Sequence, residues 1–457
     1  MEHKREIMLR EAPVNKAITS MAGPAIIGMM VSAIYNIVDT FFVGMLNDTA
    51  SLGATTVLFP VFMLISAVGM TFGMGSASAI SRKLGEKRRE EASQVASTAF
   101  FTTMGIAVVF IILGNIFIHQ LLSLFGATES ILAKAEIYGS VIISGSIFQM
   151  LNMNMNNMLR AEGAAKVSGA ALAIGAILNI ILDPLYMFVF DLGLAGAAWA
   201  TVTGQVVSTF FLASFFVRRK TIVHIDPRKF HPTVSTYAQI MKIGIPTFLR
   251  QALNSFAMAM LTNAAAPFGD SAIAAIGITL RVVMMPMMVL FGFSQGFQPL
   301  AGYAWGAKNI SRVREAVKFS VKWTSIFAIS AAVILFTGAG LIMTAFSKDP
   351  EVVARGTLSL RLNVVIMPFL GFQLIYSFLY QALGRGRPSM LLAVARQGFF
   401  FLPLVLIMPR IFGLTGVYSA QPVADVLTLA LTALLAVGIS GELKKLDTNK
   451  NDAVLKN

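Results

Sequence analysis

Two carboxylates lie inside long apolar segments of this sequence, where a charge is expensive. Asp39 belongs to the apolar stretch 24–44, and Asp183 belongs to the stretch 177–188. A carboxylate near the middle of a bilayer costs about 2.5–3.5 kcal/mol on insertion scales, so each acid needs a functional reason. Asn179 precedes Asp183 by one helical turn on the same face, and Pro184 leaves a backbone carbonyl nearby without its usual donor. This grouping of oxygens predicts a site for a small cation.

The chemistry of such a site is ion binding coupled to another process. Two acids in a medium of low dielectric constant resist being charged together, so a pair of them can take up a proton. The same oxygens can instead hold Na⁺, which prefers hard oxygen ligands. The alternative is a static interhelical hydrogen bond, but such bonds are worth only about 0.6 kcal/mol on average in membranes. That is less than the insertion cost, so we favour ion coupling, with H⁺ ahead of Na⁺.

The elements that position these residues are membrane-spanning helices. The chain has 457 residues, of which 56% are hydrophobic and only 13% are charged, whereas a soluble domain has about 25% charged residues. A spanning helix needs about 20 mostly apolar residues. Twelve such segments use up nearly the whole chain and predict an all-α polytopic membrane protein. They are 16–44, 51–81, 94–119, 131–159, 166–190, 194–217, 237–266, 271–304, 317–346, 353–383, 388–410 and 415–439.

The distribution of basic residues predicts the orientation of these helices. The net charge is +14, and most of the 36 lysines and arginines fall in the N-terminal segment, in alternate connections and in the C-terminal tail. Under the positive-inside rule this pattern places both termini in the cytoplasm. The basic loops would face anionic lipid, and we expect no nucleic-acid partner. The sequence has no cysteine, which excludes disulfides and thiolate metal sites.

The sequence repeats its layout in two halves. A polar connection at 218–236 separates the half 1–217 from the half 237–440, and a tail follows at 441–457. Displacing the second half by about 221 residues brings Pro246 onto Pro24 within one position and Gly306 onto Gly85. Six helices per half is an even number, so the halves should be related by a pseudo-two-fold axis along the membrane normal. We therefore expect two six-helix bundles that enclose a central cavity.

Several runs together resemble a known family. They are 35-YNIVDTFFVG-44, 82-RKLGEKRREEA-92 with its echo in the second half, and 179-NIILDPLYMF-188 followed by 193-GLAGAAWATVTGQ-205. In combination they look like the multidrug and toxic compound extrusion (MATE) family, and more narrowly its DinF/MepA-like branch. The resemblance covers the whole chain. It implies a V-shaped, twelve-helix secondary antiporter that exports amphiphilic organic compounds by alternating access in exchange for H⁺ or Na⁺.

The resemblance also implies roles for individual residues. The ion-coupling site of that branch lies in the N-terminal bundle, and its positions are matched here by Asp39, Asn179, Asp183 and Thr201, with Tyr138 as a weaker match. Na⁺, as the alternative ion, would be held by Asp39, Asn179 and Asp183. Pro24 matches the proline at which the first helix is proposed to bend; a static kink is the alternative.

The second half has apolar residues at the positions that match Asp39 and Asp183, so the acids are one-sided. It carries arginines within its apolar segments instead, together with one acid in the last helix. These residues are Arg250, Arg281, Arg361, Arg396 and Asp425. The arginines either extend to the nearer interface or line a cavity that would favour anionic organic substrates, which departs from the usual lipophilic cations of the family.

The absent motifs limit the remaining functions. The sequence has no G-x-x-x-x-G-K-[ST] for ATP and no H-E-x-x-H or G-x-S-x-G for hydrolysis, so we predict a transporter without a cofactor and not an enzyme. The expected partners are small organic substrates and lipids, with the protein acting as a monomer in a bacterial or archaeal inner membrane. The alternatives to a multidrug exporter are an exporter of anionic compounds and a lipid-linked oligosaccharide flippase of the same superfamily.

Overall fold

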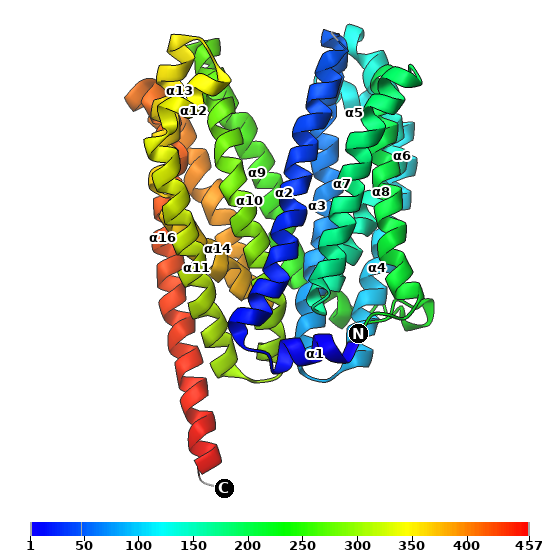
Figure 1. Ribbon diagram of the computed structural model, residues 1–457, viewed down its shortest axis with the longest axis vertical. Helices are drawn as coiled ribbons and strands as arrows, with labels where there is room; N and C mark the ends of the chain where they lie inside the picture. The colour runs from blue at the N-terminus through cyan, green and yellow to red at the C-terminus, as the bar shows by residue number, and fades with distance from the viewer. Residues whose placement is uncertain (1, 47, 456–457) are drawn as a thin grey trace.

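The computed structural model describes residues 2–46 and 48–455, which fold into two helical lobes that diverge like the arms of a V (Figure 1). The N-lobe, residues 14–217, contains six long helices and the short α5 (Ile118–Leu124). The long helices are α2 (Val14–Met45), α3 (Thr49–Gly85), α4 (Arg89–Ile116), α6 (Glu129–Ala161), α7 (Ala165–Pro184), which continues into the π-helical turn η1 (Leu185–Val189), and α8 (Gly193–Val217). These helices correspond to the six segments predicted for the first half.

The C-lobe, residues 234–455, repeats this plan with more interruptions. Its helices are α9 (Val234–Ala265), α10 (Asp270–Gly306), α11 (Ile310–Thr337), α12 (Ala339–Phe346), α13 (Pro350–Val365), α14 (Met367–Ala382), α15 (Gly386–Val394) and α16 (Leu402–Leu455). The π-helical segment η4 (Ala395–Phe401) joins α15 to α16. The 3₁₀ turns η2 (Pro227–Lys229) and η3 (Ala266–Phe268) precede and follow α9. Helices α13 and α14 meet at 47° and form one broken span. Gly413 (φ 56°, ψ −139°) reverses the chain inside α16, so that stretch contributes to two spans.

The helices account for twelve spans, as expected. By length and hydropathy, nine stretches of the described residues can cross a membrane, and the bent pair α13–α14 makes a tenth. One of the nine, Gly386–Thr448, is divided at Gly413. The last of the twelve is α9, a helix of 32 residues whose apolar sequence is interrupted by Lys242 and Arg250. One difference from the sequence prediction is that α16 continues to Leu455, so the described part of the predicted tail, 441–455, extends the last helix.

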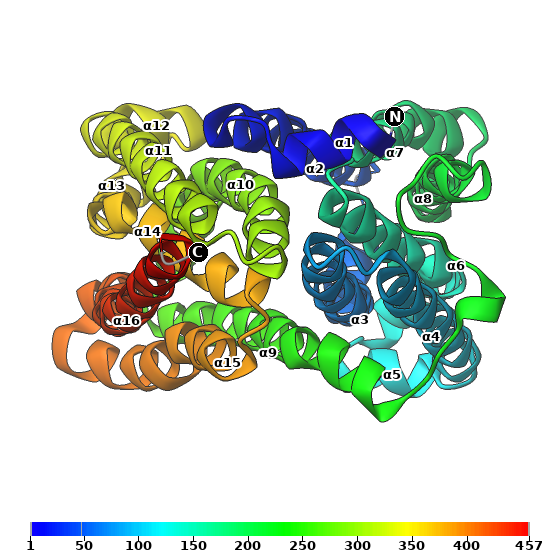
Figure 2. The ribbon, with the colours of Figure 1, turned by 90° about the horizontal axis from the view of Figure 1, so that it is seen from below.

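Helices α2 and α9, the first of each half, lie between the lobes on opposite sides (Figure 2). Helix α2 packs against α7 of its own lobe and against α10 of the other. It runs unbroken past Pro24, and α7 approaches it closely there: a Cβ on Gly169 would lie 2.4 Å from the Pro24 carbonyl oxygen. A movement of α2 therefore alters packing contacts in both lobes.

The lobes meet at the narrow end of the V through contacts between glycines and backbone carbonyls. A Cβ on Gly85 would lie 2.1 Å from the carbonyl oxygen of Tyr303, and a Cβ on Gly306 would lie 2.0 Å from that of Arg82. Arg82 also donates across the interface to the carbonyl of Ala382 at 3.2 Å. Only glycine permits this approach, so the repeated glycines predicted from the sequence form a close seal between the lobes.

The short helix α1 (Glu2–Arg10) lies across this narrow end (Figure 1). On the N-lobe side, Arg5 pairs with Glu162 at 2.8 Å. On the C-lobe side, Arg312 donates to the carbonyls of Leu9 at 3.0 Å and Ala12 at 2.7 Å. Helix α1 thus connects the two lobes beneath their contact surface.

Candidate functional site

The acid and amide of α7 are buried in the N-lobe. Asp183 is fully buried and Asn179 is 2% exposed. The Asn179 Nδ2 atom lies 3.3 Å from Asp183 Oδ1 and 3.2 Å from Thr201 Oγ1 on α8. In the reversed orientation, which satisfies both ends of the amide, Nδ2 donates to Asp183 Oδ2 at 3.2 Å and the amide oxygen accepts from the Thr201 backbone N–H at 3.1 Å. The one-turn spacing seen in the sequence therefore builds a compact polar group between α7 and α8.

Helix α2 brings the second acid to this group. Asp39 is partly buried, and its Oδ1 atom is buried without a hydrogen-bond partner among the described residues. Its charge interacts with that of Asp183, and both carboxylates interact electrostatically with Tyr35 and Tyr138. Tyr138 is 3% exposed and comes from α6. The fold thus collects the predicted N-lobe residues from four helices.

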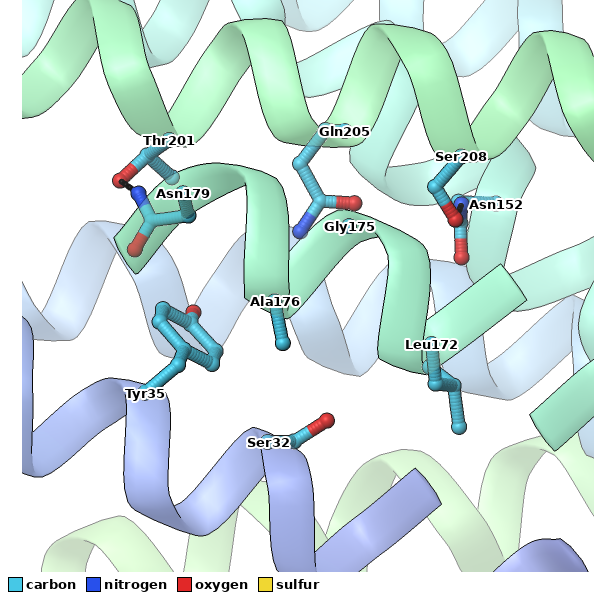
Figure 3. Close-up of a pocket in the computed structure, with 10 residues that line it drawn as sticks. All are labelled: Ser32, Tyr35, Asn152, Leu172, Gly175, Ala176, Asn179, Thr201, Gln205 and Ser208. Carbon is cyan, nitrogen blue, oxygen red and sulfur yellow. Dashed lines mark hydrogen bonds between the residues drawn. The ribbon is translucent and has the colours of Figure 1, made fainter. Parts of the chain in front are cut away.

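A small cavity of about 50 Å³ extends from this group between α2, α7 and α8 (Figure 3). Figure 3 shows Thr201 and Asn179 at one end of it and Ser208 and Asn152 at the other. Most of the lining side chains are polar. The lining residues are Ser32, Tyr35, Asn152, Leu172, Gly175, Ala176, Asn179, Thr201, Gln205 and Ser208.

A much larger cavity, of about 490 Å³, lies mainly in the C-lobe, with Met29 and Met70 of the N-lobe also lining it. Arg396 and Asp425 form a bidentate ion pair in its wall, with N–O distances of 2.7 and 3.2 Å. Gln421 donates to the same carboxylate at 3.0 Å, and Gln373 donates to the Asp425 carbonyl at 2.7 Å. The negative charge of Asp425 is therefore fully engaged.

Arg250 lines the same cavity without such a partner. Its guanidinium lies over the rings of Phe291 and Phe378, at 5.6 and 6.0 Å from their centroids. No carboxylate of the described residues lies within ion-pair distance of it. Two arginines against one aspartate leave this part of the wall with one net positive charge. Much of the remaining wall is apolar and rich in methionine, including Met284, Met287 and Met288.

Comparison with known proteins decides the family. The family model described as MatE matches residues 24–185 and 246–407, once in each half. The chain belongs to the MatE family. The multidrug export protein MepA of Staphylococcus aureus (strain NCTC 8325 / PS 47) is 30% identical over 450 residues, which cover 98% of this chain and 99% of that protein. The chain is accordingly a multi-pass membrane transporter of the MATE multidrug efflux type, with a MepA-like sequence.

Solved MATE structures share the fold over almost the whole chain. An outward-facing multidrug resistance MATE family transporter of the MOP superfamily matches with a TM-score of 0.90 and 27% identity, over 96% of this chain and 98% of its own. A MOP superfamily transporter from Pyrococcus furiosus Vc1 (DSM3638) matches with a TM-score of 0.90 and 27% identity, over 96% and 99%. That protein is described as having a binding pocket of reverse polarity that suggests a different function.

The sequence left open whether the arginines of this MATE protein line a cavity or extend to an interface; Arg250 and Arg396 are among the residues that line the C-lobe cavity, and Arg281 and Arg361 are not. Arg361 is exposed, lies 5.5 Å from the Phe336 ring centroid and donates to the Phe336 carbonyl at 3.4 Å, beyond the cavity wall. Arg281 is also exposed; it follows the lining residue Leu280, and one residue turns a helix by about 100°. The position of a residue along a helix does not determine which face of the helix it occupies.

Several polar residues of the N-lobe cavity escaped the sequence analysis. Ser32, Gln205 and Ser208 line it, and each is an ordinary residue in an apolar segment. The sequence could have indicated two of them, because the spacing of Thr201, Gln205 and Ser208 places three polar side chains on one face of α8. Such a polar stripe in a spanning helix is worth searching for, because lipid would not favour it.

Proposed function

We propose that this protein is a secondary antiporter in which a cation binding to Asp39 and Asp183 drives the outward release of an organic substrate. The observation that carries the proposal is the convergence of the two acids from α2 and α7, with Asn179 and Thr201 beside them. The substrate would occupy the C-lobe cavity, whose volume lies in the usual range for small-molecule sites. Ion and substrate would then bind in different lobes.

The coupling ion is proposed to be H⁺, with Na⁺ as the alternative. Two interacting carboxylates in a buried site favour sharing one proton over carrying two charges. Na⁺ would use the same carboxylates with the amide oxygen of Asn179. Both ions would bind the same carboxylate oxygens, and transport under an imposed proton or sodium gradient distinguishes between them.

Helix α2 is the element through which the ion would act. It carries Asp39 and packs against α7 in the N-lobe and α10 in the C-lobe. A ligand can shift a conformational equilibrium only by binding its states differently, and neutralising Asp39 changes the charge on a helix that contacts both lobes. Pro24, which also belongs to α2 and lies against Gly169 of α7, is the proposed hinge.

An anionic substrate is the second candidate for the C-lobe cavity. Among the described residues Arg250 has no acidic partner, whereas the charge of Arg396 is balanced by Asp425. One positive charge therefore remains for a ligand carboxylate or phosphate. The reverse polarity reported for the pocket of the Pyrococcus furiosus relative is a parallel in another protein. A lipid-linked oligosaccharide is less well accommodated, because about 490 Å³ suits a drug-sized molecule better.

The orientation and setting follow from the charge pattern. The basic connections and α1 lie at the narrow end of the V, so we place that end and both termini in the cytoplasm, with the V open to the outside. The protein is proposed to work as a monomer in a bacterial or archaeal cell membrane, on small organic substrates, without a nucleic-acid partner, a cofactor or an enzymatic activity.

The test is transport in proteoliposomes with an imposed proton gradient or an imposed sodium gradient, using one cationic and one anionic dye. We expect a proton gradient to drive dye movement against its concentration gradient. A sodium-only response would replace H⁺ by Na⁺, and preference for the anionic dye would favour the second candidate. Dye movement that follows neither gradient would contradict ion-coupled transport.

A further inference from the structure

A buried arginine lies in the N-lobe without a carboxylate partner. Arg160, in the last turn of α6, is 8% exposed. Its Nη1 atom lies 2.6 Å from Asn156 Oδ1 and 3.2 Å from Ser168 Oγ, and its Nη2 atom lies 2.7 Å from Asn157 Oδ1. No described carboxylate is within ion-pair distance, since Glu162 pairs with Arg5 and accepts from two backbone amides at 222 and 223. The positive charge is therefore held by neutral oxygens alone.

This arginine lies about two helical turns along α6 from Asn152, which lines the polar cavity that also contains Asn179 and Thr201. Asn152 of α6 and Leu172 of α7 line the inner end of the cavity, and Asn156 and Ser168 follow one turn closer to the narrow end of the V. Asn152 donates to Ser208 at 2.7 Å. One turn further along α6, the Asn156 amide donates to the Ser168 carbonyl at 3.2 Å. Buried polar side chains thus recur between the cavity and Arg160, and Arg160 closes this series toward the narrow end of the V.

A polar path of this kind is a hazard for a coupled transporter. An ion that reached the acids from the open side and continued to the narrow end would dissipate the gradient without moving substrate. A fixed positive charge in a buried passage opposes the entry of cations, as arginines do in pores that exclude protons. The repulsion is strong where the surroundings are poorly polarisable.

We propose that Arg160 is an electrostatic barrier that closes the inner end of the N-lobe ion path and prevents the coupling ion from leaking across the membrane. The inference rests on the proposed function of the Asp39–Asp183 pair and adds the element that makes coupling tight. A purely structural role is the alternative, because a cation in the last turn of a helix also stabilises the negative end of its dipole. The test therefore measures leak as well as folding.

The first experiment measures passive proton entry into liposomes that contain the full chain, an internal pH-sensitive dye and no substrate, under an imposed potassium diffusion potential. Arg160→Gln should raise the protein-dependent proton leak by about tenfold. Arg160→Lys keeps the charge and should stay near the wild-type rate. The double variant Arg160→Gln, Asp39→Asn should lose the extra leak, because that leak passes through the carboxylate site.

A second pair of variants keeps Arg160 and changes only the charge next to its guanidinium. Ser168 Oγ lies 3.2 Å from Arg160 Nη1, so Ser168→Asp places a carboxylate against the guanidinium and should also raise the leak. Ser168→Asn has similar size and no charge, and should remain tight. If Ser168→Asp and a folded Arg160→Gln both leak no more than wild type, the barrier does not exist.

The leak assays of the barrier and the export assay of the proposed ion site can fail independently of each other. If the single variant Asp39→Asn retains gradient-driven export, the proposal that this carboxylate binds the coupling ion is wrong, whatever proton leak the other variants show. If Asp39→Asn abolishes export while the Arg160 and Ser168 variants stay tight, the site stands and only the barrier is overturned. Elution volume and melting temperature in detergent show in each case whether the variant is folded.

Discussion

The two lobes use equivalent positions for opposite purposes. The matched halves begin at residues 24 and 246, so equivalent positions differ by 222 residues. Asp39 of the N-lobe corresponds to Leu261, and Asn179 corresponds to Phe401. Both C-lobe residues line the large cavity, whereas Asp39 and Asn179 belong to the proposed ion site of the N-lobe. At these positions one copy of the scaffold therefore presents oxygens, and the other presents hydrocarbon.

The cavities differ in volume for a related reason. Tyr35 lines the N-lobe cavity of about 50 Å³, whereas its equivalent, Ala257, lines the C-lobe cavity of about 490 Å³. A phenol fills the space between α2 and its neighbours, and a methyl group leaves that space open. A duplicated bundle can thus become an ion site or a substrate site through the residues on one face of its first helix.

Removing the acid from the N-lobe should have the largest effect. Asp39→Asn keeps the size of the side chain but removes the charge that responds to the ion, so gradient-driven export should fall on the order of a hundredfold, toward the rate of empty liposomes. Dye efflux under an imposed gradient measures this. Asp191→Asn, in an exposed loop of the same lobe, is the matched control and should transport normally. Full coupled export by Asp39→Asn would break the division between the lobes.

Removing the unpaired arginine from the C-lobe should have a smaller effect that depends on the substrate. A hydrogen bond to a charged group is worth about 1.5–3 kcal/mol, so Arg250→Ala should raise the KM for an anionic dye about 10- to 100-fold. A cationic dye should be unaffected or improved. Arg281→Ala, which removes an exposed arginine outside the cavity wall, is the control. An equal loss for both dyes would mean that Arg250 supports the packing of the lobe and does not select charge.

Introducing the N-lobe tyrosine into the C-lobe tests the volume comparison. Ala257→Tyr should fill part of the large cavity, so export of a bulky dye should fall by about tenfold while a small substrate is affected less. The ratio of the two initial rates is the measurement. Ala257→Ser is the control for a change without much added volume. A uniform loss for all sizes would instead indicate a misfolded lobe.

The smallest effect is expected at the rim of the N-lobe. Asp48 caps α3 and is bonded to Lys134, which together with Ser51 lowers the pKa of this carboxyl from 3.8 to about 2. A depressed pKa in the folded state stabilises the fold above the unfolded value and loses that effect as the pH falls through the folded value. Lys134→Ala should therefore slightly lower the melting temperature near pH 6, and the difference from wild type should shrink between about pH 4 and pH 2.

Thermal melting in detergent across that pH range measures this last effect. Lys134→Arg retains the ion pair and should behave as wild type. A difference that grew toward low pH would have the wrong sign for an acid with a depressed pKa, and would assign the stabilisation to another group.

The helices and the acids could be predicted because both signals are local. Twelve apolar stretches and two costly carboxylates are visible along the chain, and Asn179 and Asp183 share a face by spacing alone. The positions of Arg250 and Arg361 could not be separated in this way, since both lie well inside spans. Which of them faces a cavity depends on the rotation of α9 and α13 within the lobe, and the packing of neighbouring helices sets that rotation. Small polar residues such as Ser32 carry too weak a signal to be assigned before the helices are assembled.

The glycine contacts at the narrow end have a consequence for how the lobes can separate. Gly85 and Gly306 press main chain against main chain and contribute no titratable group to the contact itself. The contact is therefore insensitive to pH, and screening by salt weakens only the charged links around it. A gap of about 0.5–1 Å already removes a quarter to a half of the dispersion attraction between atoms packed this closely. The lobes should therefore be either in full contact or separated at the narrow end, and charged groups elsewhere in the molecule should determine which state is populated.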